Sequence, residues 1–288
     1  DLVVQFNASA SAAAVEAVIE NLTYRNPTSD PAATRKVSIV VSDGDGGQSA
    51  PRMIDINVTA QTDGAVRLLS EDQQVNTYTA SNQELPMIAA LQGGNAGQYV
   101  IVWQSYGQDS DSWGVFGQRY DVNGSAIGPE FQVNTTTPGA QYGQNMVGIG
   151  ALSTGGFVVA WESGDGSGNG IYAQRYDANG QPLSGEFQVN RPAENYAEQI
   201  QPRVLGLDGG AFVIAYADGY YADGDSYGVR VQHYDASGVA APGGPVTVNT
   251  AVANNQSFPQ LARLNDGGYV VVWHSLGQDG DNWGVFAQ

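Results

Sequence analysis

From residue 73 onward, apolar residues stand in short runs separated by clusters of Gly, Asp, Ser and Asn, a pattern typical of β-strands joined by turns. The runs recur as a unit of roughly 57 residues, and each copy carries a Val-Asn pair. Successive pairs are 58, 56 and 59 residues apart, at Val75-Asn76, Val133-Asn134, Val189-Asn190 and Val248-Asn249. Such a period indicates a repeat protein in which each copy buries its faces against its neighbours.

The apolar runs predict four strands in each copy. In the first copy the strands are Met87–Leu91, Tyr99–Ser105, Gly114–Tyr120 and Glu130–Asn134. Four antiparallel strands at this period predict an all-β chain folded as a β-propeller, whose blades cover about 73–134, 135–190, 191–249 and 250–288. The fourth copy lacks its last strand, and Gln73–Thr77 reads as a last strand without a blade. Either this segment completes the fourth blade and closes a four-bladed ring, or the blades form an open arc that continues beyond Gln288.

Residues 1–62 have a different pattern, and residues 63–72 read as a linker. Ala10–Leu22 has apolar residues at helical spacing and predicts one short helix. Lys36–Ser42 and Met53–Val58 alternate apolar and polar residues, so they predict two strands. Asp43 and Asp45 lie in the Asp-Gly-rich hairpin connection between them. The order of these landmarks, from Asn21-Leu22-Thr23-Tyr24 to Ile54-Asp55-Ile56-Asn57-Val58, resembles the C-terminal half of bacterial cadherin-like repeats.

That resemblance implies a partial cadherin-like or Ig-like β module in a large secreted surface protein, of the kind found in adhesins with RTX calcium repeats. The N-terminal half of such a repeat, with its own ligand acids, is missing from this sequence. An intact calcium site between modules is therefore not implied for this chain.

The charge of the chain is strongly one-sided. It has 29 acidic and 11 basic residues, with a formal net charge of −18. Such a surface repels nucleic acid and anionic membranes, and no apolar run is long enough to span a bilayer.

The first residues read as a strand rather than a signal peptide, and both ends read as cut, which predicts a fragment of a longer protein. The chain contains no Cys, so any stabilisation must come from packing or bound metal.

The loop between the second and third strands of each copy carries the best functional signal. An Asp-x-Asp pair occurs there at Asp109 and Asp111, at Asp223 and Asp225, and at Asp279 and Asp281. Carboxylates at alternate loop positions supply the hard oxygen ligands that Ca²⁺ prefers, and Asp43 with Asp45 repeats the pattern. The alternative interpretation is that Asp, Gly and Ser are only good turn formers. The sequence also lacks the Glu that closes an EF-hand loop.

Aromatic residues recur in two places. One set lies deep in apolar strands and is expected in the core: Trp103, Trp161, Tyr216 and Trp273. The other set, Trp113, Tyr227 and Trp283, ends the acidic loops, where exposed rings beside carboxylates favour sugar stacking. The alternative is that these rings fold over the neighbouring blade.

The sequence has two His, no Cys and no nucleophile elbow, so it gives little support to catalysis and singles out no glycosidase pair.

These features predict a non-enzymatic part of a large secreted bacterial surface protein, located outside the cell, with Ca²⁺-stabilised loops serving adhesion or structural display. Its expected partners are a cell-surface glycan or protein, or neighbouring copies of the same protein, without nucleic acid and without membrane insertion. The first alternative is a carbohydrate-binding propeller that uses Trp113, Tyr227 and Trp283 with Asp109, Asp225 and Asp281. A third possibility is a hydrolase whose catalytic residues lie outside this segment or at the centre of the ring.

Overall fold

The computed structural model describes residues 34–39, 52–57, 72–135, 147–166, 168–190, 198–219 and 226–288. The chain divides into two compact units, Asp1–Asp72 and Gln73–Gln288. In the first unit β1 (Thr34–Ile39) pairs antiparallel with β2 (Arg52–Asn57), close to where two strands were predicted. The predicted helix over Ala10–Leu22 and the loop with Asp43 and Asp45 lie outside the described residues.

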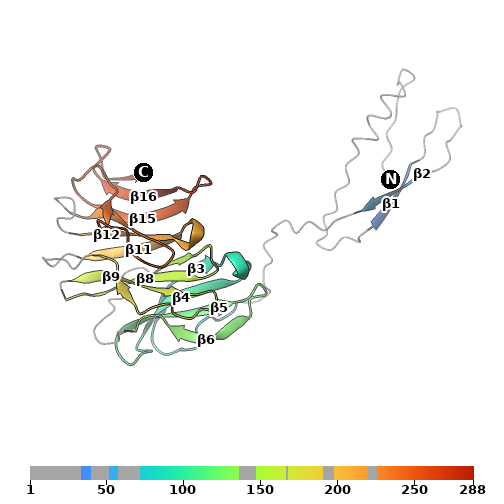
Figure 1. The fold of residues 1–288 in the computed structure, drawn as a ribbon, viewed down its shortest axis with the longest axis horizontal. Helices are drawn as coiled ribbons and strands as arrows, with labels where there is room; N and C mark the ends of the chain where they lie inside the picture. Colours follow the sequence, from blue (N-terminus) through green and yellow to red (C-terminus); the bar gives the residue numbers. More distant parts are fainter. Residues whose placement is uncertain are drawn as a thin grey trace, which may run out of the picture. The chain divides into compact units, whose positions relative to one another are not determined.

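The second unit consists of antiparallel sheets that follow one another along the chain (Figure 1). The first sheet contains β3 (Gln83–Ala90), β4 (Tyr99–Tyr106), β5 (Trp113–Tyr120) and β6 (Ala126–Gln132). The second contains β7 (Gly148–Ala151), β8 (Phe157–Gly164), β9 (Asn169–Tyr176) and β10 (Phe187–Gln188). The third contains β11 (Gln199–Gly206), β12 (Phe212–Asp218), β13 (Gly228–Tyr234) and β14 (Val246–Thr247). The fourth contains β15 (Gln256–Arg263), β16 (Tyr269–Leu276) and β17 (Trp283–Ala287).

The prediction of an all-β fold with one four-stranded antiparallel sheet per repeat is confirmed for the first three copies. In the fourth copy the described residues form three strands. Gln73–Thr77 is not a strand in the structure, and among the described residues no hydrogen bond joins it to β17. The number of blades in a complete ring and the closure of that ring therefore stay predictions. No helix of the described residues is long and apolar enough to cross a membrane.

The turns between third and fourth strands are built alike in three copies. The Oδ1 atoms of Asp121, Asp177 and Asp235 each accept backbone N–H groups from two and four residues further on, at 2.8–2.9 Å. A Gly with φ of about +80° completes each turn, a conformation that other residues rarely adopt: Gly124, Gly180 and Gly238. The Ser237 hydroxyl and the backbone N–H of Val239 hold the pKa of Asp235 below its ordinary value. The Asp-x-x-Gly sequence thus specifies the turn through its own side chain.

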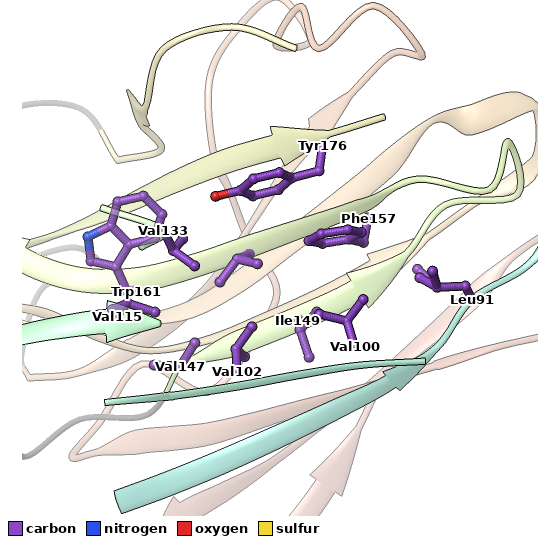
Figure 2. Close-up of a cluster of buried hydrophobic side chains, with 12 residues drawn as sticks. Leu91, Val100, Val102, Val115, Val133, Val147, Ile149, Phe157, Trp161 and Tyr176 are labelled. Atoms are coloured by element: carbon purple, nitrogen blue, oxygen red, sulfur yellow. The ribbon is translucent and has the colours of Figure 1, made fainter. Parts of the chain in front are cut away.

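The hydrophobic core lies between consecutive sheets. Between the first two sheets, Val100, Val102 and Val115 face Val147, Ile149, Phe157 and Trp161 (Figure 2). Similar clusters join the second sheet to the third and the third to the fourth. The four aromatics expected in the core are all buried: Trp103, Trp161, Tyr216 and Trp273. Each sheet therefore depends on its neighbours for burial, as the repeat predicts.

Two Arg side chains tie one sheet to the last turn of the next. Arg119 donates to the carbonyl oxygens of Ala178 and Asn179, and Arg175 donates to those of Ala236 and Ser237. Burial lowers the pKa of both guanidinium groups, although the neighbouring Asp of each turn acts in the opposite sense. Both side chains therefore bind main-chain oxygens of the turns.

The first strands of successive sheets lie against one another, β3 by β7, β7 by β11 and β11 by β15. Small residues make this approach possible. A Cβ on Gly206 would lie 2.0 Å from the carbonyl oxygen of Ala151, and one on Gly150 would lie 2.8 Å from that of Val204. The first strands thus form a closely packed layer shared by all four sheets.

Candidate functional site

A distorted backbone position recurs in the layer of first strands. The register of β3, β11 and β15 shifts immediately before Pro86, Pro202 and Pro259. The preceding residues, Leu85, Gln201 and Phe258, have φ of 55°, 61° and 56°. Such left-handed conformations cost residues other than Gly about 1–3 kcal/mol each and cluster at functional sites. Three of the first strands therefore hold the same strained bulge near the end at which they begin.

The bulges of β11 and β15 are held by side chains of the preceding sheet. The N–H of Gln201 donates to Oε1 of Glu162 at 2.6 Å, and the N–H of Phe258 donates to Oε1 of Gln201 at 2.6 Å. Glu162 lies near the end of β8 and is 2% exposed. A buried carboxylate therefore sits beside the bulge of β11.

Glu162 was not singled out from the sequence. The corresponding positions after the core aromatic hold Gln104, Ala217 and His274 in the other copies. The signal available was an acid in a strand position where the neighbouring copies have no acid. Glu162 is therefore marked in the sequence by its departure from the repeat.

The structure places two of the three predicted loop aromatics beside further exposed rings. Trp113 is half-buried and meets Tyr106 edge-on, with ring centres 5.3 Å apart, and Tyr106 is 45% exposed. Trp283 is 52% exposed, and its ring centre lies 6.2 Å from that of His274. His274 lies 5.4 Å from Phe258, which is 40% exposed and belongs to the bulge of β15. We call Phe258, His274 and Trp283 the aromatic row.

The third predicted aromatic, Tyr227, lies in a different setting. Its hydroxyl donates to Oε2 of Glu198 at 3.1 Å, and its ring leaves no room for a Cβ on Gly219. Tyr227 is thus a packed, half-buried residue rather than an open ring.

The strand ends that carry these features coincide. In an antiparallel sheet the start of the first strand, the end of the second and the start of the third lie at the same end of the sheet, along one row of strand ends. Phe258 lies near the start of β15, His274 near the end of β16, and Trp283 at the start of β17. Glu162 and Gln201 occupy corresponding places in the second and third sheets. This edge, which we call the loop edge, brings together the bulges, the carboxylate and the exposed rings.

The acidic loops also lie at the loop edge, and their first Asp is engaged locally. The Oδ1 atoms of Asp109 and Asp279 accept the N–H groups of Asp111 and Asp281 at 3.3 and 3.4 Å. The Oδ2 atoms of the same residues pack against a Gly of the third strand. A Cβ added to Gly114 or Gly284 would lie only 2.7 or 2.6 Å from them. Asp109 also accepts a hydrogen bond from the side-chain amide of Gln132 at 3.3 Å. These contacts support a role in the turn.

Ca²⁺ binding by these loops is not tested by the structure and stays a prediction. Asp223 and Asp225 lie outside the described residues. Within the part of the chain that the structure describes, no three His, Cys, Asp or Glu side chains come together in a group that could hold a metal ion.

Comparison with known proteins gives matches to solved structures alone, since no family model and no curated protein matches the chain. An α-L-arabinanase from Penicillium chrysogenum, complexed with arabinobiose, is similar with a TM-score of 0.51 and 14% identity. The match covers 74% of this chain and 64% of the arabinanase, so the chain spans less than two thirds of that protein's length. An α-L-arabinofuranosidase from Fusarium graminearum, with an iminosugar inhibitor, follows with a TM-score of 0.44, 14% identity, and coverage of 69% and 63%. The arabinanase likeness supports a propeller-type fold for the four sheets.

These comparisons correct several predictions. The resemblance to cadherin-like repeats and RTX adhesins is wrong, because the fold is similar to that of the arabinanase and not to such repeats. The prediction of a non-enzymatic adhesin drawn from that resemblance is wrong for the same reason. The adhesin prediction rested on a short helix, an Asp-Gly hairpin and an acidic composition. These features are common in proteins, and none of them depends on how the four-stranded repeats are arranged. The expected glycan partner agrees in coarse terms with the arabinobiose bound by the arabinanase. The extracellular location stays a prediction.

Proposed function

We propose that this chain belongs to a carbohydrate-processing protein and that the loop edge of its sheets binds a glycan. The observation that carries the proposal is the aromatic row, in which Phe258, His274 and Trp283 expose rings side by side next to a strained bulge. Exposed aromatic faces are suited to stack on the apolar faces of sugar rings. Large exposed rings grouped at one place on a soluble domain also mark binding surfaces in general.

The arabinanase likeness gives the proposal its substrate class. That protein was solved with arabinobiose, and other similar folds include an arabinofuranosidase and an endo-1,4-β-xylanase. A fold does not determine an activity, so the argument for this chain rests on its own residues. We therefore propose a pentose-containing plant polysaccharide, such as arabinan or arabinoxylan, as the class to test first.

For the chemical step we propose Glu162 as the carboxylate involved. Glycoside hydrolysis commonly uses two carboxyl groups, one of which donates or accepts the proton of the glycosidic oxygen. Glu162 is buried at the loop edge, and its Oε1 position is fixed by the N–H of Gln201 at 2.6 Å. This fixed position, within the edge that carries the rings, favours it over the exposed Asp residues of the loops.

The binding part is tested by isothermal titration of the 1–288 chain with oligosaccharides of arabinan and xylan, with chitin oligosaccharides as an unrelated control. Trp283→Ala should weaken binding at least tenfold, which corresponds to about 1.4 kcal/mol. Leu264→Ala is the matched control, because Leu264 is also exposed but lies at the opposite edge of the fourth sheet. If no pentose oligosaccharide binds, or if Leu264→Ala has the same effect as Trp283→Ala, the proposed site is wrong.

The catalytic part is tested by release of reducing sugar from arabinan and arabinoxylan. Glu162→Gln retains an oxygen that can accept the Gln201 N–H, so the fold should be kept while the carboxyl chemistry is lost. A fall in kcat of about 10²–10⁴ with an unchanged unfolding temperature is expected for a general acid or base. Full activity in Glu162→Gln, or absence of hydrolysis by the parent chain on every polymer, would refute the assignment.

A further inference from the structure

One residue of the third sheet joins the carboxylate of the second sheet to the bulge of the fourth. The N–H of Gln201 donates to Oε1 of Glu162, and Oε1 of Gln201 accepts the N–H of Phe258, both at 2.6 Å. Gln201 belongs to β11, Glu162 to β8 and Phe258 to β15. Gln201 therefore contacts both the group proposed for the chemical step and the main chain of the aromatic row.

The repeat explains why the bulge of β15 is held by Gln201. Glu162 pairs with Ile171 as Ala217 pairs with Val229, so Ala217 occupies the place of Glu162 in the third sheet. The methyl group of Ala217 has no oxygen to offer the N–H of the next bulge. The side chain of Gln201 supplies that oxygen instead. The acid of one sheet and the bulge of the sheet after the next are thus connected through a single residue.

Gln201 keeps a strained conformation at a buried position. It has a φ of 61° and is 8% exposed, whereas Leu85, which holds the same place in the first sheet, is 37% exposed. A residue other than Gly persists at positive φ only where its surroundings fix it. The hydrogen bonds to Glu162 and Phe258 contribute to that fixation. A shift of the Gln201 main chain would therefore displace both partners.

We propose that Gln201 is a positioning residue, which sets the place of the Glu162 carboxylate relative to the aromatic row. This inference rests on the proposed function, in which the row binds the sugar and Glu162 acts on the glycosidic bond. Gln201 acts through these two neighbours and does not itself react. Catalysis depends on such placement, because a reacting group displaced by about 1 Å can cost a factor of about 10² in rate.

The bond to Phe258 is tested by isothermal titration of the 1–288 chain with arabinan and xylan oligosaccharides. Gln201→Gly keeps the N–H that Glu162 accepts, suits the positive φ and removes the oxygen that accepts from Phe258. Binding should weaken about tenfold, the factor that corresponds to the loss of one hydrogen bond. Gln201→Glu keeps an oxygen for the same N–H, so it should bind more tightly than Gln201→Gly.

A double-mutant cycle separates positioning from a purely structural role. If Gln201 acts by placing the ring of Phe258, Gln201→Gly should have no further effect on Kd in a Phe258→Ala chain. The matched control is Gln232→Asn, which shortens another buried Gln of the third sheet, toward the other end of β13. This control should lower the free energy of unfolding in urea without changing Kd.

Hydrolysis of arabinan tests the link to Glu162. Gly gives the bulge more conformational freedom, so the carboxylate loses its fixed place although it is still present. The kcat of Gln201→Gly should fall about tenfold, which is less than the loss expected for Glu162→Gln. Gln201→Glu should recover part of that loss.

The outcomes separate this inference from the proposed function. If the parent binds and hydrolyses but Gln201→Gly matches it in either Kd or kcat, Gln201 is not a positioning residue and the proposed function stands. An equal effect of Gln201→Gly on Kd in the parent and in the Phe258→Ala chain would also overturn the inference. A parent chain that binds no pentose oligosaccharide, or hydrolyses none, refutes the proposed function and this inference with it.

Discussion

The clearest quantitative prediction concerns Asn190. Its side chain accepts the N–H of Ile171 at 2.8 Å and donates to Gln199 at 2.7 Å, and all three residues are buried. Asn190→Ala leaves a buried donor and a buried acceptor without these bonds. Each such loss costs about 1–3 kcal/mol, and partial relaxation of the site places the expected total at about 3 kcal/mol.

Urea unfolding followed by tryptophan fluorescence should show this loss as a lower free energy of unfolding. In thermal unfolding of a unit the size of Gln73–Gln288, each kcal/mol corresponds to a shift in Tm of about 2–4 °C, so Tm should fall by about 6–12 °C. The m-value should be unchanged, because the surface exposed on unfolding is the same.

Two further substitutions serve as controls for Asn190→Ala. Asn76 is half-buried and makes its cross-sheet bond at 3.2 Å, so Asn76→Ala should cost about 1 kcal/mol or less. Asn190→Asp keeps an oxygen for the Ile171 N–H and should fall between the parent and Asn190→Ala. If Asn190→Ala is no more destabilising than Asn76→Ala, the hydrogen bonds of Asn190 to Ile171 and Gln199 do not stabilise the junction between sheets.

Three other predictions concern the junctions between sheets. Arg175→Met should lower the free energy of unfolding by about 1–3 kcal/mol in urea, because two main-chain carbonyl groups lose their donor, and Arg175→Lys should recover part of it. Burial lowers the pKa of His233, so the folded chain resists its protonation; stability should be full above the ordinary value of 6.5 and fall as the pH drops below it. In His233→Gln, unfolding between pH 7 and 5 should lose that dependence. Gly206→Ala should lower Tm markedly because its Cβ meets a carbonyl oxygen at 2.0 Å, whereas Gly94→Ala, with nothing within 4 Å, should leave Tm within a degree or two, as scanning calorimetry can show.

The sequence predicted the sheets because their signals are local. Alternating and continuous apolar runs mark the strands, and Asp-x-x-Gly marks a turn that forms through its own side chain. Trp161 was expected in the core because a large ring within an apolar strand has nowhere else to pack, and it is buried. The Val-Asn period was also visible, but its purpose was not. The two bonds of Asn190 go to residues in different sheets, 19 positions before it and 9 after it, so no single strand contains both partners.

The candidate site was harder to predict for two reasons. Leu85 and Phe258 adopt positive φ, which sequence patterns assign to Gly or Asn, so the bulges had no signature. Glu162 was passed over because its importance comes from contact with Gln201, which lies 39 residues away in the chain. The exposed Trp283 was noticed, since a ring at the end of a loop is unusual in sequence as well as in space. The wrong adhesin prediction came from residues 1–62, whose pattern says little about the repeats.

The Arg anchors have a consequence for how such a chain can vary. Arg119 and Arg175 bind the carbonyl oxygens of the neighbouring turn, which every residue possesses, and do not depend on particular side chains there. Asn179 in one turn accepts from Arg119 through its carbonyl oxygen, and Ser237 in the next turn accepts from Arg175 in the same way. Substitutions at Asn179 or Ser237 can therefore leave these hydrogen bonds intact. Gly180 and Gly238 are different, because a Cβ there would lie 2.7 and 2.3 Å from the side chains of Arg119 and Arg175. The sequence of these turns can thus vary at the residues that offer only their carbonyl oxygens, while the two Gly positions stay fixed.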